Sequence, residues 1–91
     1  MYTLVWTFGF TRAARKFLKQ HPDLREKFIA ILDDLERDPF QPHLRYHHLG
    51  GKLQGVQAIS ITCSYRITLT TLIANQEINL LDVGSHDDVY R

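Results

Sequence analysis

The 91-residue sequence predicts an α+β fold, in which two helices cover one face of a mainly antiparallel sheet. Three observations predict this class. Apolar and polar residues alternate at the start of the chain, a helical period follows, and the second half is rich in β-branched residues between turn signals. The expected element order is β-α-α-β-β-β, in a single domain that spans residues 1–91.

The first half predicts a strand and a helical hairpin. A strand is expected over Met1–Phe8, where apolar side chains alternate with threonines. From Thr11 to Gln20 apolar residues recur at helical spacing, and Pro22 interrupts this helix and begins a second one. The second helix ends before Pro39, because a residue that precedes proline avoids the α conformation. Its apolar stripe consists of Leu24, Phe28, Ile31, Leu32 and Leu35.

The second half predicts an irregular segment followed by three strands. From Phe40 onward, proline and glycine mark turns or bulges. Strands are expected over Val56–Thr62, Tyr65–Thr71 and Glu77–Val83, since these runs are rich in strand-forming residues. Gly84 is expected to end the last strand and to begin a polar tail. The sheet face turned away from the helices would remain open, at least in part, to a ligand.

Composition limits the class of protein. No apolar run approaches the ~20 residues that a membrane span needs, and the chain opens without the basic segment of a secretory signal. The single cysteine, Cys63, excludes an internal disulfide framework. The sequence also lacks the paired Cys/His spacing that would favour a zinc site. We therefore expect a cytoplasmic protein without a membrane partner, metal or other cofactor.

The net charge of +1 conceals two basic blocks without any acid. The first, residues 1–20, places its cations at the i, i+3, i+4 and i+7 positions of one helix face, namely Arg12, Arg15, Lys16 and Lys19. The second, residues 41–70, contains Arg45, Lys52 and Arg66. Acids dominate the remaining blocks. A basic helix face without acids suits a phosphate backbone, and an ordinary solvated face is the alternative.

Arg66 is the candidate phosphate-binding residue. Strand alternation places it on the face opposite Tyr65 and Ile67, which are expected to pack against the helices. A guanidinium on a rigid strand can hold a phosphate and stabilise its developing charge. The alternative is an exposed cross-strand arginine without a chemical role.

Three histidines are candidate acid–base groups. His47 and His48 lie in the irregular segment, and His86 follows the last strand. Imidazole exchanges protons near neutral pH. With Lys52 and Arg66, two such positions would suffice for metal-free RNA cleavage, in which a base takes the 2′-hydroxyl proton and an acid protonates the leaving 5′-oxygen. Taken singly, each histidine is better interpreted as an ordinary surface or capping residue; taken with Arg66, the two interpretations are balanced.

Six short motifs form a pattern that covers nearly the whole chain. They are Trp6, Ala13-x-x-x-Phe17-Leu18, Asp38-Pro39-Phe40, His48-Leu49-x-Gly51, Tyr65-Arg66-Ile67 and Val83-Gly84-Ser85-His86-Asp87-x-Val89-Tyr90. In order and spacing they resemble the RelE/ParE toxin superfamily of bacterial toxin–antitoxin systems, above all its YafQ-like and RelE/StbE-like mRNA interferases. The resemblance implies an α+β microbial-ribonuclease-like fold, metal-independent mRNA cleavage in the ribosomal A site, and neutralisation by a cognate antitoxin.

The resemblance also assigns roles to residues. Arg66 matches the strand arginine that contacts the scissile phosphate, and His86 matches a C-terminal histidine proposed as general acid or base. His47, or His48 with one residue of alignment slack, matches the histidine before the Leu-x-Gly turn. The resemblance and the basic pattern together predict that Lys52 also holds the phosphate.

Two positions depart from the family pattern. YafQ-like enzymes carry a further histidine and aspartate on the middle strands, where this chain has Ser60 and Ser64. A serine cannot replace a general base of that kind. The ParE branch poisons DNA gyrase and lacks the RNA-cleaving residues, so the presence of Arg66 with His86 favours the ribonuclease branch.

The sequence therefore predicts a toxin that cleaves ribosome-bound mRNA. Arg45 and Tyr90 would contact the substrate, and the cations of the first helix would bind ribosomal RNA. The free chain is expected to be a monomer that forms a hetero-oligomer with its antitoxin. The alternatives are a gyrase poison and a catalytically degenerate member that only binds the antitoxin.

Overall fold

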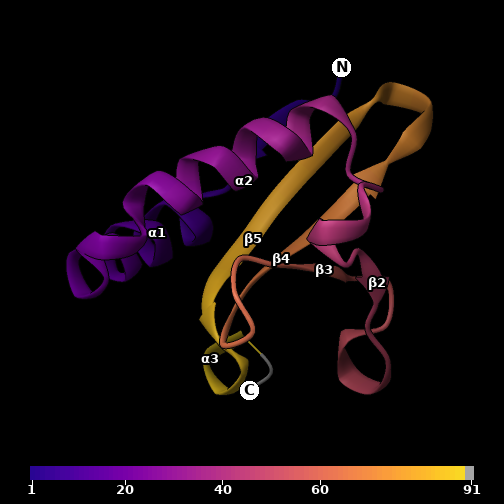
Figure 1. Cartoon of the computed structure of the whole chain (residues 1–91). Coiled ribbons are helices and arrows are strands. Elements are labelled where there is room, and N and C mark those ends of the chain that lie inside the picture. Colours follow the sequence, from indigo (N-terminus) through magenta and orange to yellow (C-terminus); the bar gives the residue numbers. More distant parts are fainter. Residues whose placement is uncertain (90–91) are drawn as a thin grey trace.

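A five-stranded sheet with two helices on one face forms the body of the protein (Figure 1). The computed structural model describes residues 1–89, apart from the side chain of Asp88, so the predicted substrate contact Tyr90 lies outside the described residues. The strand order is β1-β5-β4-β3-β2, with β1 parallel to β5 and the other pairs antiparallel. The strands are β1 (Thr3–Trp6), β2 (His47–His48), β3 (Gln57–Ser60), β4 (Tyr65–Leu72) and β5 (Glu77–Ser85). The predicted α+β class is confirmed.

The described residues form three α-helices and several short 3-10 turns, and the start of the first helix is set by a capping side chain. They are α1 (Phe8–Gln20), α2 (Arg25–Arg37) and α3 (His86–Val89), and short 3-10 turns occupy Pro22–Leu24 (η1), Pro42–Leu44 (η2), Gly51–Leu53 (η3) and Ile73–Asn75 (η4). Helix α1 starts earlier than predicted because Thr7 caps it: the Thr7 hydroxyl accepts a hydrogen bond from the Phe10 amide at 3.2 Å and donates one to the Leu80 carbonyl at 2.6 Å. In residues 1–89, no helix is both long and apolar enough to cross a membrane.

The core lies between the helices and one face of the sheet. Aromatic residues of α1 and α2 meet there, and the Phe10 and Phe28 rings stack with centroids 6.2 Å apart. The sheet contributes side chains that are at most 4% exposed: Ile59, Ile67, Leu69, Ile78, Leu80 and Val83. The amphipathic stripes that predicted both helices therefore face the sheet.

The C-terminal part differs from the prediction. The prediction that a polar tail begins at Gly84 is wrong. Strand β5 continues through Gly84 to Ser85, and helix α3 follows directly. Gly84 stays in the sheet because it pairs with Arg66 of β4. Helix α3 is anchored by Val89, which is only 7% exposed. This arrangement returns His86 to the end of the molecule where the irregular segment lies.

Side-chain hydrogen bonds hold the irregular segment between α2 and β3 in place. The Gln41 amide nitrogen donates to the carbonyl oxygens of Asp34 at 2.8 Å and Asp38 at 3.1 Å. Leu44 is fully buried beneath the segment. Arg45 adopts a left-handed conformation with φ 54°, which reverses the chain into β2. The segment is thus fixed on α2 at one end and on β3 at the other.

Candidate functional site

The pairing register defines which side chains share a face with Arg66. Arg66 of β4 lies between Ser60 of β3 and Gly84 of β5. Its neighbour Ile67 is fully buried in the core under the helices, so Arg66 projects from the opposite face, as the alternation predicts. Arg66 is only partly exposed, which places its guanidinium in a recess of that face.

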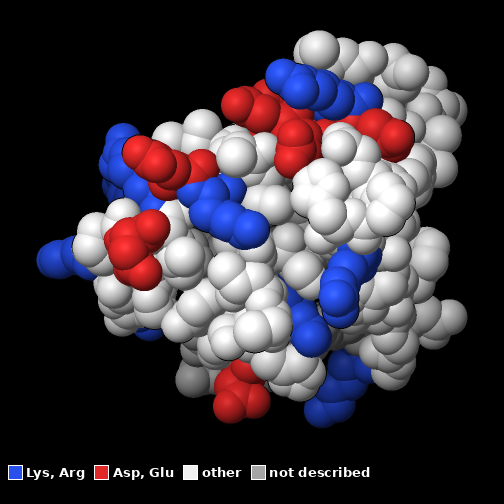
Figure 2. Space-filling model, in the orientation of Figure 1, with Lys and Arg blue, Asp and Glu red and all other residues white. Residues whose placement is uncertain are grey.

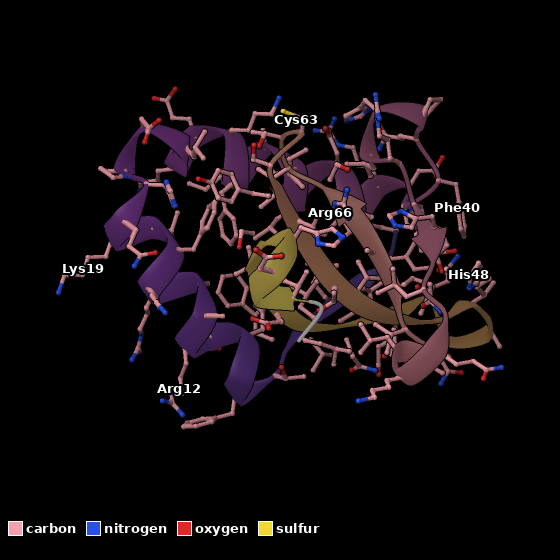
Figure 3. The ribbon with its side chains drawn as sticks, turned by 90° about the horizontal axis from the view of Figure 1, so that it is seen from below. Arg12, Lys19, Phe40, His48, Cys63 and Arg66 are labelled. Atoms are coloured by element: carbon pink, nitrogen blue, oxygen red, sulfur yellow. The ribbon has the colours of Figure 1, made fainter. Side chains whose placement is uncertain are left out.

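The two adjacent histidines of β2 lie on different faces. His47 pairs with Ala58, and Ala58 shares the face of Arg66, since it stands two residues before Ser60. His48 pairs with Gln57 and therefore belongs to the other face. Figure 3 shows His48 well apart from Arg66. Of the two histidines that the sequence leaves open, the register places His47 on the face of Arg66.

A hydrogen bond fixes the tautomer of His47. Its Nδ1 lies 2.7 Å from the carbonyl oxygen of Arg45. Because a carbonyl only accepts, Nδ1 donates the proton, and the neutral ring keeps its lone pair on Nε2. The His47 ring is exposed, so Nε2 is accessible to a ligand.

Arg66 lines a hollow of about 200 Å³, which we call the arginine hollow. Its lining residues come from the irregular segment and from β3, β4 and their connection: His43, Arg45, Ser60, Thr62, Cys63 and Arg66. The hollow brings together two of the predicted residues, Arg45 and Arg66. It also contains His43, which sequence reasoning did not select. Its position two residues before Arg45, within the same acid-free block, is the signal that was present.

A second hollow, of about 430 Å³, joins the C-terminal helix to the η3 turn. Lys52 and His86 line it together with Leu49, Gly50 and Leu53. The His86 side chain is 62% exposed, and its Nδ1 lies 3.8 Å from the Asp87 Oδ1. Two predicted groups that are far apart in the sequence thus meet across one hollow. Arg66 projects toward the viewer in Figure 3, between α3 and the segment that leads into β2.

Charge is distributed unevenly over the surface. Figure 2 shows basic side chains grouped at the lower right, over the end of the sheet near β2, and acidic side chains gathered above them. Within the described part of the chain, no group of three or more His, Cys, Asp or Glu side chains lies close enough together to hold a metal ion. The chemistry that these two hollows offer is that of cations and imidazoles.

The cations of α1 form a separate basic surface. All four predicted residues are exposed: Arg12, Arg15, Lys16 and Lys19. Figure 3 shows Arg12 and Lys19 projecting from the outer side of α1, away from Arg66. The guanidinium carbon of Arg12 lies 5.9 Å from the centre of the Phe8 ring, within cation–π range. The structure therefore does not join these cations to the two hollows.

Comparison with known proteins identifies the fold. No protein-family model and no curated protein matches the chain. Among solved structures, however, its fold is that of the RelE/ParE-type toxins of toxin–antitoxin systems. Similar structures include YafQ from E. coli strain BL21(DE3), with a TM-score of 0.83 and 12% identity over 100% of both chains. The YoeB/ParE toxin from Agrobacterium tumefaciens is similar with a TM-score of 0.75 and 20% sequence identity, over 92% of this chain and 98% of that chain.

A third similar structure contains a partner. The E. coli DinJ-YafQ complex matches with a TM-score of 0.81 and 12% identity, over 100% of both chains. The expected RelE/ParE-like fold is thus confirmed, although few residues are identical. The fold is shared, and the chemistry of this chain must be argued from its own side chains.

Proposed function

We propose that this chain is the toxin of a toxin–antitoxin module and acts as a metal-independent, ribosome-dependent mRNA endonuclease. The observation that carries the proposal is the arginine hollow, where Arg45 and Arg66 face one small recess on the sheet face turned away from the helices. Two guanidiniums around such a recess suit a phosphate group. His47, on the same sheet face as Arg66, and His86, in the second hollow, are groups that can exchange protons.

The proposed reaction needs two proton transfers and no metal. A histidine takes the proton of the RNA 2′-hydroxyl, and the 2′-oxygen then attacks the adjacent phosphorus. The bond from phosphorus to the 5′-oxygen breaks, and His86 gives that oxygen a proton, so the products are a 2′,3′-cyclic phosphate and a 5′-hydroxyl. Arg66 and Lys52 stabilise the charge that develops on the phosphate. The sequence leaves the role of proton acceptor to His47 or His48, and the register of β2 favours His47 of these two.

Ribosome dependence is proposed from the basic face of α1. Its four exposed cations lie apart from both hollows, so they serve a contact other than the scissile phosphate. Ribosomal RNA presents a dense phosphate backbone that such a face would bind, with a strong dependence on salt. The α1 surface would then dock the chain, while the hollows act on the mRNA.

Growth arrest tests the proposed roles of Arg66 and His86. Arg66→Ala and His86→Ala are expected to abolish growth arrest on expression, because loss of one charge-stabilising or proton-transferring group typically slows such reactions by ~10²–10⁴-fold. His48→Gln, on the other sheet face, is the matched control and is expected to remain toxic. Retained toxicity in both active-site variants would contradict these roles.

The mode of action is read from nucleic acid isolated after expression. Primer extension on cellular mRNA is expected to show cuts spaced by codons. Gyrase-linked DNA breaks without mRNA cuts would identify a gyrase poison instead. An intact folded chain that cells tolerate fully would identify a member that only binds its antitoxin.

A groove beside β1 supports a protein partner. The groove measures about 660 Å³ and lies between β1 and α2, with Trp6, Phe28 and Ile29 among its walls. Trp6 and Ile29 are 46% and 48% exposed. The amides of Thr3 and Thr7 bond to β5, so the intervening Leu4 and Trp6 present their backbone groups outward along the sheet edge. An extended apolar segment could add there as a sixth strand.

Co-purification tests the groove as the antitoxin surface. The partner is expected to be the product of the neighbouring reading frame, and Ile29→Asp is expected to weaken its co-purification at least tenfold, since a charge would be buried against an apolar segment. Ile73→Asp is the matched control, because Ile73 is 61% exposed on η4 and does not line the groove. Equal recovery with both variants would place the partner elsewhere.

A further inference from the structure

We infer that His43, oriented by Asp34, is the proton acceptor of the arginine hollow. The inference rests on the proposed function, because it assigns a residue to the RNA cleavage step. In this step the imidazole of His43, which lines the same hollow as Arg66, accepts the proton of the RNA 2′-hydroxyl. The sequence leaves this role to His47 or His48, and the geometry points to a different histidine.

The chemistry of the hollow leaves few candidates for a base. The guanidiniums of Arg45 and Arg66 carry N–H donors and no lone pair that could take a proton, and the hydroxyls of Ser60 and Thr62 do not act as general bases. Ser60 lies directly opposite Arg66 in the sheet, so this paired position carries no base. Among the lining residues, only the imidazole of His43 and the thiol of Cys63 remain.

The contact with Asp34 gives His43 the orientation of a base. His43 Nε2 lies 2.8 Å from Asp34 Oδ2 on helix α2. Because an ionised carboxylate only accepts, the proton of the neutral ring resides on Nε2 and the lone pair on Nδ1. A base that is oriented by a carboxylate is the arrangement that nucleophile activation commonly uses in enzymes. The His43 side chain is 52% exposed, so an RNA strand can reach it.

The backbone around His43 is held on both sides. Gln41 bonds to two carbonyl oxygens at the end of α2, and the adjacent Leu44 is fully buried. An acid–base group contributes most when its position is fixed before the substrate arrives. The η2 turn supplies this by tying His43 to the helix that carries Asp34.

His47 compares less favourably with His43. It lies on the same sheet face as Arg66, but it is not among the residues that line the arginine hollow. Its ring is oriented by the Arg45 carbonyl at 2.7 Å, a neutral acceptor, whereas His43 is oriented by a carboxylate. A carboxylate that holds the ring of the base in one tautomer and orientation is the arrangement found in catalytic triads, which favours His43 over His47 as the acceptor.

Single-turnover cleavage of mRNA on purified ribosomes tests the inference. His43→Gln is expected to slow cleavage by ~10²-fold or more at saturating chain, while His48→Gln cleaves at the wild-type rate. His47→Gln is expected to lose less than His43→Gln. Cys63→Ser separates the two remaining candidates, and a loss in this variant that equals or exceeds the loss in His43→Gln would overturn the inference.

Asp34→Asn separates a role in proton transfer from a merely structural one. This variant is expected to slow cleavage by about tenfold or more. It should also change the tautomer of His43, which is read from the ¹⁵N chemical shifts of its imidazole, because an amide NH2 can turn toward Nε2 and the proton is no longer required there. The groups that face His43 are Asp34 from α2, Arg45 after η2, and Arg66 and Cys63 from the sheet end, and only Asp34 changes. A slower variant with an unchanged His43 tautomer would contradict the inference.

The outcomes separate the inference from the proposed function. A wild-type chain that leaves ribosome-bound mRNA intact would overturn both. A wild-type chain that cleaves, with His43→Gln equally active, would overturn the inference alone and return the role to His47. All variants are compared only after their circular dichroism and thermal unfolding match the wild type, which the exposure of His43 favours.

Discussion

The two faces of the sheet carry different side chains, and the difference separates stability from chemistry. The face under the helices carries large apolar residues that are nearly inaccessible to water, such as Ile67, Leu69 and Leu80. The opposite face carries small or polar residues, among them Ala58, Ser60, Arg66, Thr68 and Gly84. One face of each strand therefore contributes apolar burial, which is the main favourable term in folding.

This division teaches how a small chain can combine a core with a site. Adjacent residues of β4 have different roles: Ile67 is buried in the core, and Arg66 lines the arginine hollow. A strand with a two-residue period allows both because neighbouring side chains never compete for the same space. Substitutions on the two faces should then have separable effects on the free energy of unfolding and on activity.

The largest effect on stability is expected from the helix-covered face. Leu69→Ala should lower the free energy of unfolding by ~2–5 kcal/mol, because a fully buried leucine is removed and its cavity is only partly refilled. Leu72→Ala on the same strand is the control; Leu72 is 47% exposed, and its substitution should cost less than about 1 kcal/mol. Urea unfolding of both variants measures the contrast, and equal losses would contradict the assignment of the core face.

An effect of intermediate size and opposite sign is expected at Gln57. It is a buried polar residue on the core face: it pairs with Leu69, is 8% exposed, and leaves its Oε1 buried without a hydrogen-bond partner. Gln57→Met keeps the length of the side chain and removes the orphaned oxygen, but it also removes two long hydrogen bonds of Nε2, to the Gly55 carbonyl at 3.3 Å and to His48 Nδ1 at 3.4 Å. Because an unpaired buried oxygen costs more than such long bonds contribute, the free energy of unfolding should rise by about 1 kcal/mol. Gln57→Glu should lower it, because a charge would be buried there. A destabilised Gln57→Met would show that the amide is needed for packing.

The smallest effect on stability is expected from the opposite face. Arg66→Ala, the variant proposed to abolish growth arrest, should change the free energy of unfolding by only about 1 kcal/mol or less, since the side chain lies outside the core. The same urea titration measures it beside Leu69→Ala. A loss as large as that of Leu69→Ala would mean that Arg66 supports the fold, and its effect on toxicity would then have a structural cause.

Most of the regular structure could be predicted from periodicity. Apolar spacing located α1 and α2, and the Ile- and Thr-rich runs located β3, β4 and β5 within a few residues. Most errors fall at the element ends, where capping decides, but the prediction also missed the short strand β2, which lies inside the segment expected to be irregular. Thr7 extends α1 back to Phe8, and Val89 turns the expected polar tail into α3.

The site could be predicted only in part, because its parts meet through long-range pairing. Alternation places Arg66 on the face away from the helices, but only the register of β2 against β3 separates His47 from His48. His43 carries no periodic signal, and its relation to Asp34 depends on how η2 returns to α2. The roles of these residues in catalysis stay predictions.

The outer edge of β1 has a consequence for how the chain is kept in solution. Edge strands with exposed backbone groups can pair with other chains, and natural proteins usually protect them. Here the edge lies beside the exposed side chains of Trp6 and Ile29. Unpaired backbone groups that could bind another strand therefore lie next to an exposed apolar surface. A partner that covers β1 would protect this edge from pairing with other chains, whatever its effect on activity. A chain separated from that cover would face a risk of aggregation that grows with its concentration.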